Sequence, residues 1–385
     1  MSDPPAVDPF DDVSLELLRA RRSAKWTKYP ADVLPAWVAE TDFALALPIR
    51  EVLQTAVARD DTGYPDIGRL PEAFAAFAAS RFGWRVEPEN VRLVADVMSA
   101  VEALLRLATG PGDAVVVNPP VYPPFFSVTR VVGRSVVEAP LATDSSLDLD
   151  AIESAFAAGA RAYLLCNPHN PTGRPCTRAE LEQIAALAAR YGVTVISDEV
   201  HAPMTLPGAT HVPYLSVGEE ACAHGVVVTS ASKTWNLAGL KCAVIVSASK
   251  SMDERLTEGL PMHLPYHAGH FGVLAGIAAF AHGSEWLDAL IVHLDRNRTL
   301  LGRLLDEQLP GVRYTPPQAG YLAWLDCRAL GLSDDPAVEF LERGRVALSP
   351  GPSFGKEGNG FARLNIGTSS ALVEEAVSRM AAAVA

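Results

Sequence analysis

The stretch VVVTSASKTWN, residues 226–236, places an apolar run directly before a lysine, Lys233. VVVT has the composition of a strand that is buried on both faces, as in a parallel sheet covered by helices. A lysine at the start of the following loop is most often a solvated surface residue. The residues that follow the other predicted strands decide whether Lys233 is such a residue or a buried reagent.

Four further apolar runs resemble VVVT, and helical patterns lie between several of them. The runs are AVVVN (114–118), YLLCN (163–167), VTVIS (193–197) and CAVIVS (242–247). AELEQIAALAARYG (179–192) is a predicted helix, which Thr177 and Glu180 introduce as a capping box. VMSAVEALLRLATG (97–110) is a second predicted helix. This alternation predicts an α/β fold with a mainly parallel sheet, since parallel strands need crossover connections.

The two ends of the chain have a different character. Residues 1–48 are Pro-rich and irregular, and a long helical pattern, SEWLDALIVHLDRNRTLLGRLLDEQL (284–309), begins after about residue 280. A candidate strand, YLAWLDC (321–327), follows it. We therefore expect a large α/β domain over 49–280 and a smaller α+β domain over 281–385. The N-terminal segment is expected to pack with the smaller domain.

The composition excludes several classes of partner and site. The 385 residues include 32 Lys and Arg against 45 Asp and Glu, giving a formal net charge of −13, which suits neither nucleic acid nor an anionic membrane. The five cysteines form no C-x-x-C, so neither a disulfide framework nor a metal site is predicted. No uninterrupted apolar stretch of about 18 residues predicts a membrane span. MSDPPAVDPFDD lacks the regions of a signal peptide, and we expect a cytoplasmic protein.

Polar residues follow four of the apolar runs, at the carboxyl ends where open α/β sheets bind ligands. They are NPHNPTG (167–173), Asp198-Glu199-Val200-His201, Ser230-Ala231-Ser232-Lys233 and Pro119-Pro120-Val121-Tyr122. Each set has an ordinary interpretation: a turn, a helix N-cap, a surface lysine and a rim tyrosine. Their coincidence at four strand ends favours one shared ligand site.

One ligand accounts for all four sets: an aromatic aldehyde with a ring nitrogen, a phenolic oxygen and a phosphate. Lys233 would form a Schiff base with the aldehyde, and Asp198 would hold the ring nitrogen protonated. An asparagine would donate to the phenolic oxygen, and Tyr122 would stack on the ring. The serines and a helix N-terminus would bind the phosphate. This ligand is pyridoxal 5′-phosphate (PLP).

With these residues the sequence resembles the fold type I PLP enzymes of the class I/II aminotransferase superfamily. It is similar in particular to the cystathionine β-lyase-like C–S lyases of the MalY/PatB type. The superfamily motifs are NPHNPTG, SDEVH and SASKTWNLAGLK. The motifs of the narrower group are KWTKYPADVLPAWVAETDF (25–43), HGSEWLDAL (282–290) and GYLAWLDCR (320–328). The resemblance covers nearly the whole chain, and it implies a mainly parallel seven-stranded sheet and a homodimer with a shared active site.

The resemblance assigns a role to each matching residue around the cofactor ring. Lys233 is the Schiff-base lysine and proton carrier, and Asp198 pairs with the pyridinium nitrogen. Asn170 contacts the phenolic oxygen and the substrate carboxylate, and Tyr122 stacks on the ring. His201 stands where many relatives place a tyrosine for the same oxygen; it either donates to that oxygen or packs behind it.

The positions that match phosphate ligands surround the start of one predicted helix. They are Ser230, Ser232, Lys241 and the backbone N–H groups near Val97 and Met98. Most aminotransferases carry arginine where this sequence has Lys241. A lysine is a point charge and cannot make the bidentate fork of arginine to phosphate.

Two further matches concern the neighbouring subunit and the substrate. Tyr64, in TGYPD, matches a residue that reaches the phosphate of the neighbouring subunit in relatives. Arg363, in FARLNIG, matches the arginine that binds the substrate α-carboxylate, for which the guanidinium fork is well suited. An exposed salt bridge is the alternative interpretation of Arg363.

These roles imply an enzyme that acts on an amino acid through loss of its α-proton to Lys233. The resemblance favours β-elimination from cystathionine or another S-substituted L-cysteine, with Tyr122 as a candidate acid for the departing sulfur. Transamination of an apolar or aromatic amino acid is the alternative, since the same lysine serves both routes. A regulatory binding protein on the same fold is an alternative from another class.

Overall fold

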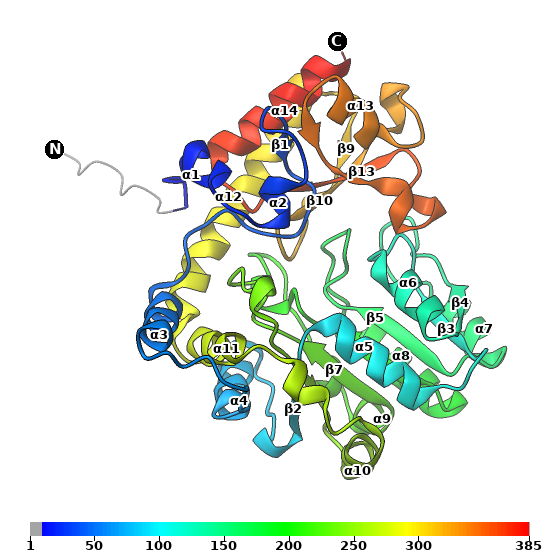
Figure 1. Cartoon of the computed structure of the whole chain (residues 1–385). Coiled ribbons are helices and arrows are strands. Elements are labelled where there is room, and N and C mark those ends of the chain that lie inside the picture. Colours follow the sequence, from blue (N-terminus) through cyan, green and yellow to red (C-terminus); the bar gives the residue numbers. More distant parts are fainter. Residues whose placement is uncertain (1–9, 385) are drawn as a thin grey trace.

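The computed structural model describes residues 10–384, and its main sheet has seven strands within that range (Figure 1). Their order is β2 (Val91–Val94), β8 (Ala243–Val246), β7 (Gly225–Thr229), β6 (Thr194–Asp198), β5 (Ala162–Cys166), β3 (Ala114–Val117) and β4 (Ser135–Glu138). The pairs from β7 to β4 are parallel, whereas β8 is antiparallel to both its neighbours. The predicted α/β fold with a mainly parallel seven-stranded sheet is therefore confirmed.

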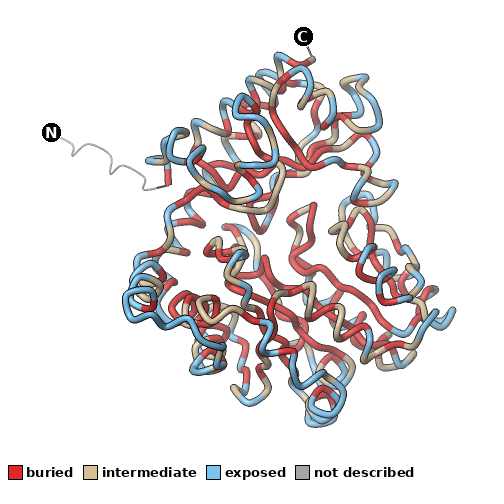
Figure 2. Tube along the Cα trace, viewed as in Figure 1, coloured by how far each residue is buried: buried red, intermediate tan, exposed pale blue. Residues whose placement is uncertain are grey.

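Successive residues of the central strands enter two hydrophobic cores, one on each face of the sheet. On β6, for example, Val195 packs into one core and Ile196 into the other. One core is completed by α5 (Val97–Ala108), α6 (Pro124–Val131) and α10 (Lys250–Gly259). The other contains α7 (Leu149–Ala157), α8 (Arg178–Tyr191) and α9 (Glu219–His224). Burial on both faces explains why these strands are uninterrupted apolar runs (Figure 2).

A second, smaller sheet lies above the carboxyl ends of the main strands (Figure 1). Its order is β12 (Ser349–Pro350), β13 (Phe361–Asn365), β10 (Leu322–Asp326) and β9 (Arg313–Tyr314). The helices α13 (Pro336–Glu342) and α14 (Ser370–Val384) belong to this part of the chain. The N-terminal segment reaches it as well, because β1 (Leu34–Pro35) pairs in parallel with β11 (Val346–Ala347). Its first nine residues lie outside the described range.

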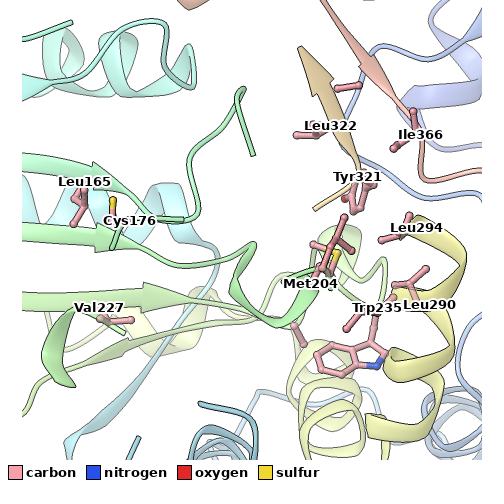
Figure 3. Packing of buried hydrophobic residues seen from close by; sticks show 14 of the residues in the cluster. Leu165, Cys176, Met204, Val227, Trp235, Leu290, Leu294, Tyr321, Leu322 and Ile366 are labelled. Atoms are coloured by element: carbon pink, nitrogen blue, oxygen red, sulfur yellow. The ribbon is translucent and has the colours of Figure 1, made fainter. Parts of the chain in front are cut away.

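Four further helices complete the described structure beside the two sheets. They are α3 (Leu47–Ala58), α4 (Leu70–Phe82), α11 (His270–His282) and α12 (Ser284–Gln308), preceded at the N-terminus by the short α1 (Leu15–Arg19) and α2 (Ala24–Thr27). The long α12 runs from α11 toward the smaller sheet (Figure 1). Figure 3 shows Met204, Trp235 and Tyr321 facing Leu290 and Leu294 of this helix. The two parts of the chain thus share one continuous hydrophobic core.

Candidate active site

The register of the central strands places three of the predicted motifs side by side at the carboxyl ends of β5, β6 and β7. Cys166 of β5 lies opposite Asp198 of β6, and Asp198 lies opposite Val228 of β7. The residues that follow these positions are NPHNPTG, Glu199-Val200-His201 and the loop with Lys233. Because the three strands are parallel and adjacent, their carboxyl ends form one edge of the sheet.

Lys233 is half-buried at this edge, and its Nζ donates to the backbone oxygen of Ala39 at 3.2 Å. Burial is the main cause that lowers its pKa, and the charge of Arg363 acts in the same direction. The carboxylates of Asp198 and Glu40 oppose the shift. A lowered pKa increases the neutral fraction of the amine, which is the form that acts as a nucleophile or a base.

Asp198 is buried, and its carboxylate accepts a hydrogen bond from the backbone N–H of Val200 at 3.1 Å. Burial raises the pKa of Asp198 to about 7, although this hydrogen bond and the charge of Lys233 lower it. A buried carboxylate in this condition is suited to an incoming cation, because an opposite charge restores its ionised form. A protonated ring nitrogen is such a cation.

Arg363 of β13 is only 6% exposed, and no salt bridge joins it to a carboxylate among residues 10–384. Its Nη1 donates to Asn170 Oδ1 at 2.9 Å, and its Nη2 donates to Ser349 Oγ at 2.9 Å and to the backbone oxygen of Trp37 at 3.1 Å. Nε has no hydrogen-bond partner within the described residues. The interpretation as an exposed salt bridge is therefore wrong. A buried guanidinium with a free donor is suited to a carboxylate ligand.

Burial favours the neutral forms of both Tyr122 and His201. Burial, followed by the charge of Asp198, raises the pKa of Tyr122 to about 12. Burial also lowers the pKa of His201 to about 3, and the charges of Lys233 and Arg363 add to the shift. A neutral phenol and a neutral imidazole can each donate one hydrogen bond to a ligand oxygen.

The predicted phosphate ligands include the start of α5 and two serines of the loop that carries Lys233. Asp96 caps this helix by accepting from the backbone N–H of Ser99 at 2.8 Å, and Val97 and Met98 occupy its first two positions. The Oγ of Ser230 accepts from the backbone N–H of Ser232 at 3.0 Å. Helix N–H groups and hydroxyls at a positive helix end are typical anion ligands.

Lys241 contacts the N-cap residue of α5 through its side chain. Its side chain is more than half exposed, and its Nζ forms an ion pair with Asp96 Oδ2 at 2.9 Å. Its backbone φ is +59°, in the left-handed region. The positive charge at position 241 is therefore shared between the helix cap and any anion bound beside it.

Tyr64 is the one predicted site residue that lies outside this cluster within the described chain. It is in the connection between α3 and α4, and its side chain is 87% exposed. The structure therefore does not bring Tyr64 to Lys233 of the same chain.

The sequence did not predict the part that residues 37–42 play in the site. The backbone oxygens of Trp37 and Ala39 accept from Arg363 and Lys233, and Asn236 binds both backbone groups of Thr41. Backbone carbonyls have no residue signature, so no motif of reactive side chains could reveal them. The resemblance of WVAETD to the narrower group was the available signal.

The chemistry of the donors fits PLP. An amine of lowered pKa, a buried acid, a buried amide and a helix N-terminus correspond to the aldehyde, ring nitrogen, phenolic oxygen and phosphate, and the Tyr122 ring can lie against the cofactor ring. No group of three His, Cys, Asp or Glu that could hold a metal occurs in residues 10–384. Over the same range, no helix is long and apolar enough to cross a membrane.

Known proteins with the same architecture were found by sequence and by structure. A Mycobacterium leprae protein named "Putative cystathionine beta-lyase" is 45% identical over 396 residues, which span 97% of each chain. Cystathionine beta-lyase PatB of Bacillus subtilis is 34% identical and covers 94% of this chain and 96% of its own. The crystal structure of a "putative plp-dependent beta-cystathionase" from Corynebacterium diphtheriae superposes with a TM-score of 0.92 at 37% identity, covering 96% and 98%. The model of the family aminotransferase class I and II matches residues 29–380. The chain belongs to the class I and II aminotransferase family.

Proposed function

We propose that the chain is a PLP-dependent C–S β-lyase that acts on cystathionine or a related S-substituted L-cysteine. The observation that carries the proposal is the pair of Lys233, an amine of lowered pKa, and Arg363, a buried guanidinium without a carboxylate partner in the described chain. Both groups contact one backbone segment, residues 37–42, so they face the same space. The names of the relatives, cystathionine beta-lyase and beta-cystathionase, support the reaction class.

The residues around Lys233 would hold the cofactor by its four functional groups. Asp198 would pair with the ring nitrogen, Tyr122 would lie against the ring, and Asn170 and His201 would donate to the phenolic oxygen. The phosphate would be held by the set already described, namely Ser230, Ser232, Lys241 and the N–H groups of Val97 and Met98. When bound, PLP supplies an electron-withdrawing ring that stabilises negative charge at the substrate Cα.

The chain's own groups would then position the amino acid and move its protons. Arg363 and Asn170 would fix the carboxylate, and the neutral amine of Lys233 would remove the α-proton. Tyr122 remains protonated at neutral pH, because burial raises its pKa to about 12, and it can donate a proton to the departing sulfur. The net reaction consumes one water and gives a thiol, pyruvate and ammonia.

The test supplies L-cystathionine as the only substrate and measures pyruvate. We expect pyruvate and free thiol in equal amounts without any added 2-oxo acid. Lys233→Ala should lower kcat by at least about a thousandfold, since it removes both the amine that binds the aldehyde and the base. Lys250→Ala, which changes a 90% exposed lysine, is the matched control and should leave kcat unchanged.

Two outcomes would contradict the lyase proposal. Turnover that requires a 2-oxo acid would instead favour an aminotransferase, which uses the same lysine. Full activity in Lys233→Ala would refute the central residue assignment.

We also propose that the active enzyme is a cytoplasmic homodimer in which Tyr64 reaches the partner subunit's phosphate site. Large apolar side chains at Tyr64, Met262 and Tyr266 are exposed to solvent in the single chain, as at protein interfaces. Each subunit would comprise a large domain over 49–280 and a smaller domain over 281–385, with residues 1–48 packed on the smaller one.

A further inference from the structure

A strap, which we define as residues 37–42 (WVAETD), lies across the candidate site and contacts both sides of it. On one side, the backbone oxygen of Ala39 accepts from Lys233 Nζ at 3.2 Å. On the other, the backbone oxygen of Trp37 accepts from Arg363 Nη2 at 3.1 Å. The strap therefore fixes the distance between the candidate base and the candidate carboxylate ligand through its own backbone.

The smaller sheet and the lysine loop hold the middle of the strap. Asn365 Nδ2 donates to the backbone oxygens of Val38 and Glu40, both at 2.7 Å. Asn236 accepts from the N–H of Thr41 at 3.3 Å and donates to its carbonyl at 3.0 Å. These contacts set the direction in which the Ala39 carbonyl points.

A buried ion pair anchors the end of the strap. Asp42 is 2% exposed and accepts from Lys25 Nζ at 2.7 Å and from Trp26 Nε1 at 3.0 Å. Lys25 is 1% exposed, and its Nζ also donates to the backbone oxygen of Glu40 at 3.1 Å. Buried ion pairs stabilise a fold no better than apolar side chains of similar volume, but they require one geometry. This pair links α2 to the strap. Neither member is a candidate reacting group.

We propose that Lys25 and Asp42 are positioning residues, which act through the strap to hold the Ala39 carbonyl as the acceptor for the Lys233 amine. The inference rests on the proposed function, in which the substrate displaces Lys233 and the freed amine takes the α-proton. In this structure the Ala39 carbonyl accepts one hydrogen of the free amine. A fixed acceptor on one side directs the nitrogen lone pair toward the substrate.

The groups that face Lys233 predict how its titration responds to a displaced strap. Arg363 of β13 lowers the pKa of the amine, Asp198 of β6 and Glu40 of the strap raise it, and His201 is affected in turn by the lysine's charge. A carbonyl acceptor stabilises the ammonium form. Burial is the largest cause of the lowered pKa of Lys233. A shift of the strap that leaves the amine buried weakens both this carbonyl contact and the Glu40 interaction, so the pKa of Lys233 should fall further.

The first measurement does not require lyase activity. PLP is added to cofactor-free protein, and the rate of its linkage to Lys233 is followed by absorbance as a function of pH. The rate rises with the neutral amine, and its midpoint reports the pKa of Lys233. In Asp42→Asn we expect this midpoint to fall by about half a pH unit or more, because a hydrogen bond to the charged form is lost.

The second measurement uses the holoenzyme with its amino-acid substrate. For Asp42→Asn we expect kcat to fall at least about tenfold while KM changes less than about threefold, since a misplaced base costs chiefly the proton transfer. The isotope effect of α-deuterated substrate on kcat should increase. A pair that only stabilised the fold would lower the melting temperature without moving the isotope effect.

Two variants complete the experiment. Lys25→Met/Asp42→Asn removes both charges, avoids an unpaired buried ion and should behave as Asp42→Asn does. Asp32 lies in the same N-terminal segment and forms an exposed ion pair with Arg345. Asp32→Asn breaks this pair and should have the midpoint, kcat and isotope effect of the wild type. An unchanged midpoint in Asp42→Asn or in the double variant would overturn the proposal. Wild-type kinetic values in the double variant would overturn it as well. So would a shift of the midpoint in Asp32→Asn as large as that in Asp42→Asn. If the wild-type protein had no lyase activity but Asp42→Asn still shifted the midpoint of PLP linkage, the positioning role would stand. Only the proposed β-lyase reaction would then be refuted.

Discussion

At the scale of single residues, burial acts in opposite directions on the acids and bases of the site. It raises the pKa of Asp198 to about 7 and lowers those of His201 and Arg363 to about 3 and about 10. Burial disfavours the charged forms of Asp198 and Arg363, so each gains from a partner of opposite charge. A cationic ring nitrogen offers such a partner to Asp198, and a carboxylate offers one to Arg363. The site gains more from a zwitterionic ligand than from a neutral one.

The raised pKa of Asp198 predicts a pH-dependent stability for the cofactor-free protein. Its pKa is about 7 when folded, against a usual value of 3.8, so the folded state binds more protons between these limits. The contribution of Asp198 to stability must therefore fall as pH rises from about 4 to 7. A shift of this size corresponds to an effect on the order of 4 kcal/mol. We expect Asp198→Asn to be more stable relative to wild type at pH 7.5 than at pH 4.5, as measured by urea unfolding.

The comparison must be made between variants, because His201 acts with the opposite sign. Its folded pKa of about 3 lies below the usual value of 6.5, so its contribution to stability rises with pH through the same window. The difference between Asp198→Asn and wild type cancels this contribution. An equal stability difference at both pH values would show that Asp198 is ionised throughout.

The sequence predicted the reactive side chains of the site better than its polar framework. Lys233, Asp198 and Asn170 follow apolar strands of a parallel sheet, and that position alone implied a shared edge. The Ala39 carbonyl could not be predicted, since every residue has one. The Lys25–Asp42 pair was also missed, because one lysine and one aspartate 17 positions apart form no recognisable motif.

At the scale of elements, the predictions were accurate where burial is complete. The five apolar runs form β3, β5, β6, β7 and β8 with ends within one residue or so of those expected. The apolar runs did not reveal β2 and β4, the two edge strands, which have one neighbour each and four residues each. Because β4 is exposed at Ser135 and Glu138, it lacks the apolar run of a central strand. Uninterrupted apolar runs therefore identify the central strands of a sheet more readily than its edge strands.

The capping box of α8 is confirmed, and it supports a prediction about stability. Thr177 accepts from the N–H of Glu180, and the Glu180 carboxylate accepts from the N–H of Thr177 at 2.7 Å. The helix ends at Gly192, whose φ of +68° is left-handed. Thr177→Ala should lower the free energy of unfolding by about 1 kcal/mol, whereas Thr177→Ser should retain the cap. Urea unfolding measures both, and equal losses in the two variants would exclude capping as the cause.

At the scale of the whole molecule, the N-terminal segment joins parts that are distant in sequence. It pairs with β11 through β1, contacts Arg363 and Lys233 through residues 37–42, and then continues into α3. The shared hydrophobic core also joins the two sheets. Tyr64 is exposed in the single chain, and we propose that it serves the phosphate site of a partner subunit.

A mixed dimer tests whether Tyr64 acts across the subunit interface. Tyr64→Phe should weaken PLP binding in a uniform dimer, because the phosphate loses a hydroxyl donor. In a dimer of one Tyr64→Phe and one Lys233→Ala subunit, only the first subunit has a working lysine. If Tyr64 acts across the interface, that site receives its tyrosine from the second subunit, and its PLP affinity returns to the wild-type value. If Tyr64 acts within its own chain, the affinity stays as weak as in the Tyr64→Phe dimer. A monomeric, fully active wild-type protein would exclude the shared site altogether.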